Sequence, residues 1–115
     1  MLSGLYFINF HSTFRNINVG QGIIMIEDGF VNGADFNYIY QGTFDFYGDD
    51  IKAEIDVRHY RGPLNSVLGP FKEFTLILSG KKSGDNFEVI GAIPNNPNQA
   101  ITIIGSKIAD LYPHK

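Results

Sequence analysis

The 115-residue sequence contains no cysteine and no tryptophan. The absence of cysteine excludes disulfide bridges, thiolate zinc ligands and thiol nucleophiles, and it is typical of a reducing compartment. No apolar run approaches the ~20 residues with which an α-helix spans a bilayer, and no basic and apolar leader precedes the strand pattern that starts at Leu5. We therefore expect a cytoplasmic protein that is neither exported nor embedded in a membrane.

The charge balance is mildly acidic, with 12 Asp plus Glu against 9 Lys plus Arg. A protein that binds a phosphate backbone needs clustered lysine and arginine, and this sequence has no basic stripe. Direct binding to DNA or RNA is therefore not expected. The length suits a single domain with one core, spanning residues 1–115.

Residues that could carry chemistry are few. The histidines His11, His59 and His114 lack the paired spacing of metal ligands. Glu54 and Asp56 share one strand face, but basic residues flank them, as cross-strand partners of surface carboxylates do. The sequence therefore predicts no metal, no cofactor and no catalytic residue, and we do not expect an enzyme.

Glycine and aromatic residues are abundant, with 13 Gly, 10 Phe and 6 Tyr. Together with the scarcity of helical periodicity, this composition indicates an all-β fold. Turn residues such as Asp28-Gly29, Asn32-Gly33 and Gly84-Asp85 separate the apolar segments. The expected strands lie near Leu5 to His11, Val19 to Glu27, Phe30 to Asn32, Phe36 to Phe46, Ile51 to Tyr60, Glu73 to Lys81, Asn86 to Ala92 and Gln99 to Ile108.

The short connections between these strands favour antiparallel pairing of sequence neighbours. An open sheet of eight strands would leave two bare edges, and closing the last strand onto the first removes both. The sequence therefore predicts an eight-stranded, up-and-down antiparallel β-barrel.

Aromatic residues at every second position mark the inner face of one strand, because strand side chains alternate between faces. The next strand adds apolar residues with the same alternation. Eight-stranded barrels either fill their interior with side chains or keep a small cavity, so a packed core and an apolar ligand site both remain open. The predicted cavity residues are Phe36, Tyr38, Tyr40, Phe44, Ile55 and Val57.

Three strands carry apolar residues on both faces, and closure of the barrel would make these strands neighbours. A contiguous external apolar patch usually marks a protein interface, so we expect a homodimer. The alternatives are that a loop covers the patch, or that the apparent outer face is the inner one. The predicted interface residues are Tyr6, Ile8, Phe10, Ile24, Ile26, Ile101 and Ile103.

The longest irregular segment, Arg61 to Phe71, contains two prolines and two glycines together with several apolar residues. An apolar loop prefers to be buried. It either folds over one barrel end as a plug or simply completes the core.

Glycine turns and strand aromatics follow a defined order along nearly the whole chain. They are Gly4-x-Tyr6-x-x-x-Phe10, Gly20-x-Gly22, Asp28-Gly29, Gly33-x-Asp35, Tyr38-x-Tyr40-x-Gly42, Ser66-Val67-Leu68-Gly69 and Phe74-Thr75-Leu76. This ordered set resembles the GrlR-like negative regulators of type III secretion. The resemblance implies a lipocalin-like barrel with an apolar cavity, a plug-like loop and a dimeric state.

The resemblance also implies a function, which is to bind a transcriptional activator and keep it from DNA. That family carries a run of four acidic residues in a surface loop, and the matching turn here holds Asp45, Asp49 and Asp50. Phe46, Tyr47 and Gly48 interrupt the run in this sequence. The three aspartates are the predicted partner-binding residues, or else an ordinary solvated hairpin turn. The alternative function is a barrel that binds a small hydrophobic ligand.

Overall fold

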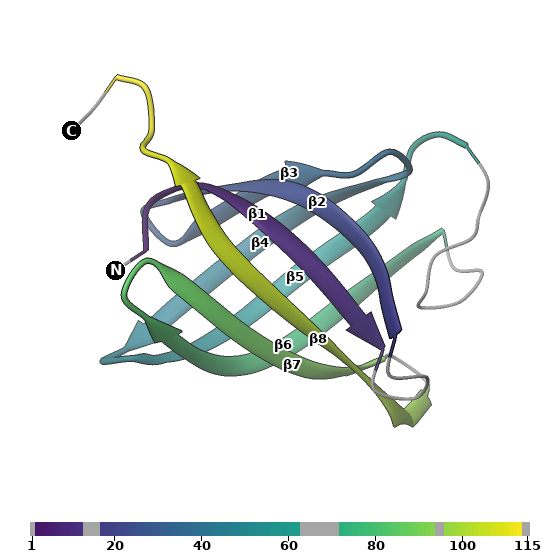
Figure 1. Cartoon of the computed structure of the whole chain (residues 1–115). Coiled ribbons are helices and arrows are strands. Elements are labelled where there is room, and N and C mark those ends of the chain that lie inside the picture. The colour runs from purple at the N-terminus through teal and green to yellow at the C-terminus, as the bar shows by residue number, and fades with distance from the viewer. Residues whose placement is uncertain (1, 13–16, 63–71, 94–95, 114–115) are drawn as a thin grey trace.

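The computed structural model describes residues 2–12, 17–62, 72–93 and 96–113. These ranges form eight β-strands and no helix, and each strand pairs antiparallel with the next. Since β8 also pairs with β1, the sheet closes into an up-and-down barrel, which confirms the predicted fold (Figure 1). The strands are β1 (Gly4–Ser12), β2 (Ile17–Glu27), β3 (Phe30–Ala34), β4 (Tyr38–Tyr47), β5 (Asp50–His59), β6 (Glu73–Ser83), β7 (Asn86–Ile93) and β8 (Asn96–Ala109).

The two ends of the barrel differ in their connections. Two-residue turns join β2 to β3, β4 to β5 and β6 to β7, and because strand direction alternates, all of them lie at one end. In the first of these turns Asp28 and Gly29 have φ values of 53° and 82°, as a type I′ hairpin requires. The start of β1 and the end of β8 lie at the same end, which we name the hairpin end (Figure 1). The opposite end is named the loop end.

The barrel interior is the hydrophobic core. Along β5 the side chains alternate strictly, and Ile51, Ala53, Ile55 and Val57 face inward with at most 5% of their surface exposed. No polar or charged residue falls in the buried class among the described residues. Burial of apolar surface is therefore the main stabilising term of this fold.

The residues predicted to form an external dimer patch lie inside the barrel instead. Each of them is at most 7% exposed and belongs to the core cluster. Because β1, β2 and β8 are apolar on both faces, alternation alone did not distinguish inside from outside. Glycines on β2, at positions 20 and 22, pair with positions 10 and 8 of β1 and leave room for large inward side chains. The prediction of an outward position is therefore wrong for Tyr6, Ile8, Phe10, Ile24, Ile26, Ile101 and Ile103.

A second correction concerns Phe36, which was predicted to line the interior. Its side chain is 81% exposed, because β4 begins only at Tyr38 and residues 35–37 form a turn outside the ladder. The predicted plug, Arg61 to Phe71, falls almost entirely on residues 63–71, which lie outside the described residues.

Candidate functional site

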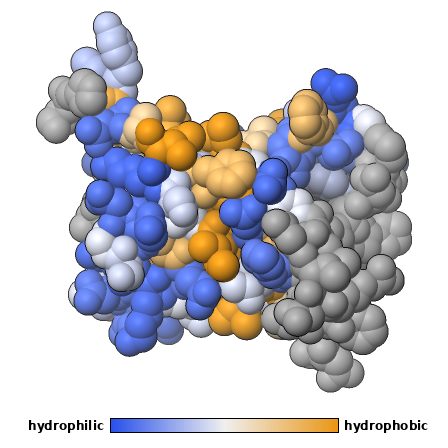
Figure 2. All heavy atoms as spheres, in the orientation of Figure 1, coloured by the Kyte–Doolittle hydropathy of each residue, from blue (hydrophilic) through white to orange (hydrophobic). Residues whose placement is uncertain are grey.

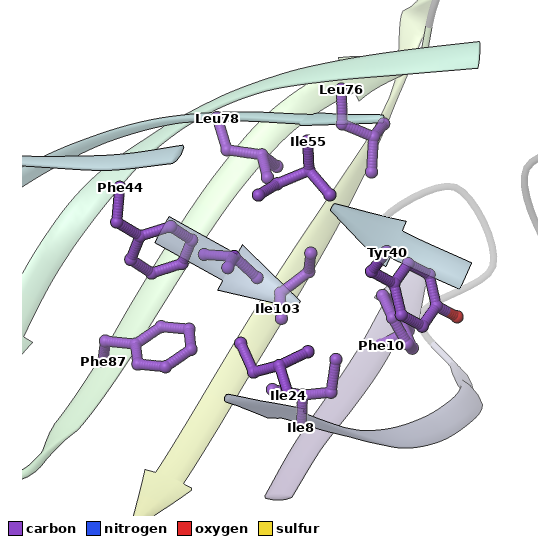
Figure 3. Close-up of a pocket in the computed structure, with 11 residues that line it drawn as sticks. Ile8, Phe10, Ile24, Tyr40, Phe44, Ile55, Leu76, Leu78, Phe87 and Ile103 are labelled. Atoms are coloured by element: carbon purple, nitrogen blue, oxygen red, sulfur yellow. The ribbon is translucent and has the colours of Figure 1, made fainter. Parts of the chain in front are cut away.

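A small apolar cavity lies within the barrel (Figure 3). Tyr40, Phe44 and Ile55 of the predicted cavity residues line it, whereas Tyr38 and Val57 are buried in the core but do not line it. Its volume is about 20 Å³, on a measure by which one water molecule needs roughly 10 to 15 Å³. A drug-sized ligand needs a pocket many times larger. The described interior is therefore filled by side chains, and ligand binding stays a prediction that this packing does not favour.

Aromatic rings account for much of this filling. Phe44 and Phe87 meet edge to face with their ring centroids 5.1 Å apart, and Tyr6 packs on Phe87 at 5.6 Å. Phe10 and Tyr40 pack at 5.4 Å. These are favourable aromatic separations. The interior is a specific packing arrangement whose rings would have to move to admit a ligand.

A hydrogen-bond cluster centred on Asp35 lies at the loop end. One carboxylate oxygen, Oδ1, accepts hydrogen bonds from the backbone N–H groups of Asn37 at 2.8 Å and Tyr38 at 2.7 Å, and Oδ2 accepts one from the Tyr40 hydroxyl. Burial, followed by this hydrogen bond to Asp35, raises the pKa of the Tyr40 phenol far above its ordinary value of 10.0. The Tyr40 hydroxyl therefore keeps its proton even at a pH at which an exposed tyrosine ionises.

The same turn is also tied to the end of β5. The Tyr60 hydroxyl donates to the backbone oxygen of Asp35 at 2.7 Å, and the Tyr60 N–H donates to that of Asn37 at 2.9 Å. The Asn37 side-chain amide donates to the backbone oxygen of Arg61 at 3.2 Å. We name the hydrogen bonds of Asp35 and Asn37 together the Asp35 brace. These hydrogen bonds join the β3–β4 turn to the start of β4 and to the residues that follow β5.

Beneath this turn, the Tyr38 ring packs against His59 with the ring centroids 5.4 Å apart. The His59 Nε2 atom lies 2.7 Å from the backbone oxygen of Gly62. The Tyr38 hydroxyl is buried and has no hydrogen-bond partner among the described residues.

The hairpin end gathers acidic residues that are far apart in the sequence. Asp28, Asp49 and Asp85 each lie in a different hairpin turn, Asp50 begins β5, and Asp110 follows β8. All five are exposed. The lysines at this end are fewer, so the end is net acidic. The barrel topology therefore extends the predicted acidic turn into a larger surface.

Ion pairs offset part of this charge. Two of the predicted partner-binding aspartates are paired, whereas Asp45 lies on the outer wall opposite Lys52 and has no ion pair among the described residues. The aspartates of these pairs are exposed, and surface ion pairs contribute only ~0 to 1 kcal/mol each, so a cationic partner can replace the lysine at each aspartate. The pairs join Lys81 to Asp50 at 3.3 Å, Lys82 to Asp49 at 3.4 Å and Lys107 to Asp110 at 2.6 Å.

Sequence reasoning missed Asp28, Asp85 and Asp110 as members of this surface. Each stands in an ordinary turn or terminal segment, and nothing local connects it with Asp49. The available signal was that alternate hairpins of an up-and-down barrel lie at one end, so acidic residues in those turns must gather there.

The outward-facing side chains of β8, β1 and β2 form an apolar surface (Figure 2). They alternate along each strand with the residues that were predicted to form the interface, which face the interior. Phe7 pairs with Ile23 and Leu5 pairs with Met25 across β1 and β2, and β8 adds Ile104. Ile23 is 47% exposed and the other four are partly exposed. We name these five residues the apolar wall. The outer face of β5, by contrast, carries a charged residue at every second position from 52 to 58.

The sequence matches no protein-family model and no curated protein. The resemblance to the GrlR-like regulators therefore rests on the motifs alone and stays a prediction. The described residues contain no group of three or more His, Cys, Asp and Glu side chains placed to hold a metal ion. They also contain no helix long and apolar enough to cross a membrane.

Proposed function

We propose that this chain is a cytoplasmic regulatory protein that binds a transcriptional activator and keeps it from DNA, as its resemblance to the GrlR-like regulators implies. The observation that supports this proposal is the acidic hairpin end, where Asp28, Asp49, Asp50 and Asp85 are brought together by the topology. Among the described residues, the small interior cavity favours a role for the outer surface over a role in carrying a ligand.

The chemistry of such a complex follows from the partner's own task. A DNA-binding face is rich in lysine and arginine because it contacts phosphates. The hairpin end offers the complementary charge, and Asp45 adds a carboxylate on the adjoining wall. Complementary charges of this kind speed association and fix orientation, and salt screens them. The complex should therefore weaken as ionic strength rises.

The first experiment is native mass spectrometry of the protein purified from its own host under gentle conditions. It reports subunit number, retained proteins and retained small molecules in one spectrum. A retained DNA-binding regulator is the expected result. A bound species of a few hundred daltons would instead favour the ligand-binding alternative, and a chain that retains no regulator would contradict sequestration.

A matched pair of variants then locates the contact. Asp45→Asn combined with Asp49→Asn removes one charge from the hairpin end and one from the adjoining wall, and Glu54→Gln combined with Asp56→Asn removes two from the β5 wall. We expect only the first pair to weaken regulator binding, with a reduced salt dependence. Equal affinity of both double variants would place the contact elsewhere.

We also propose that the protein dimerises through the apolar wall. A standard interface buries ~800 Å² per partner with an apolar centre and a polar rim. The wall supplies the centre, and the uncharged Asn9, Gln21 and Ser106 beside it supply part of the rim. A second copy can cover this surface without burying an unpaired charge at these rim positions, because Asn9, Gln21 and Ser106 are neutral.

Sedimentation of two lysine variants tests the dimer. Ile23→Lys places a charge in the apolar wall, whereas Ile77→Lys places one on an isoleucine that is 63% exposed beside Glu54 on another face. We expect Ile23→Lys to be monomeric and Ile77→Lys to keep the mass of the parent. A dimeric Ile23→Lys variant would refute this interface.

A further inference from the structure

We draw no further inference here: the strongest candidate, the groove beside Tyr47 on the outer face of β5 and β6 near the hairpin end, is lined by two lysines that face aspartates on the neighbouring strands, so nothing in the structure shows which ligand or partner would occupy it.

Discussion

Replacing Asp35 with alanine should be among the most destabilising changes to a partly exposed residue of this barrel. The substitution leaves the Tyr40 hydroxyl, which belongs to a side chain only 6% exposed, without its acceptor, at a cost of ~1 to 3 kcal/mol. It also removes the acceptor of two backbone N–H groups, which bond at 2.8 and 2.7 Å. Loss of a comparable side-chain acceptor at a helix N-terminus costs ~0.5 to 2 kcal/mol, and we take the same range for this turn. We expect a total loss of about 1.5 to 5 kcal/mol in the free energy of unfolding.

Thermal and urea unfolding followed by circular dichroism measures this loss. An unfolding entropy of ~2.1 cal/mol/K per residue converts about 1.5 to 5 kcal/mol into a fall in Tm of roughly 6 to 20 °C for a chain of this length. Asp35→Asn keeps an acceptor for the backbone donors, so it should cost about 1 to 2 kcal/mol. Asp45→Ala, an exposed control, should stay within ~0.5 kcal/mol of the parent. An Asp35→Ala variant within ~1 kcal/mol of the parent would refute the reasoning.

Three further predictions concern the barrel interior. Phe87→Ala should cost about 3 to 5 kcal/mol and open a cavity, so that benzene raises the Tm of the variant but not of the parent. Burial raises the pKa of Tyr40, so the folded state keeps this proton at a pH where the unfolded chain, titrating near 10.0, loses it. The free energy of unfolding should therefore fall as pH rises above about 10, and less steeply in Tyr40→Phe, as urea titrations at several pH values would show. Ile103→Lys, at a side chain 7% exposed, should unfold the protein instead of producing a folded monomer, as circular dichroism would reveal.

The sequence was most informative where one face of a strand was polar. On β5 the alternation of Ile51, Ala53, Ile55 and Val57 with charged residues placed every side chain on its observed face. On β1, consecutive residues such as Tyr6 and Phe7 are both apolar, so the alternation of polar and apolar residues does not indicate which face is buried. Hydrophobicity shows that a residue can be buried, but it does not show which of two apolar faces the barrel encloses.

The sequence-based prediction for the turn before β4 was wrong for a different reason. Aromatic spacing extends back to Phe36, so the period suggested a strand from that residue onward. The carboxylate of Asp35, however, accepts the N–H groups of Asn37 and Tyr38 and holds residues 35–37 in a turn. Such side-chain bonds to the backbone compete with strand pairing, and a periodicity argument does not include them.

Local sequence determined the strands, the tight hairpins and, through the need to remove bare edges, the closed eight-stranded barrel, because these depend on alternation and on turn residues near in the chain. Tertiary structure alone decided which faces became the core and that the interior is filled by rings such as Phe44 and Phe87. It also decided that Asp28, Asp49 and Asp85 share one end while Phe36 stands at the other. These properties depend on distances between residues far apart in sequence, which are fixed only when the barrel closes and its side chains pack together.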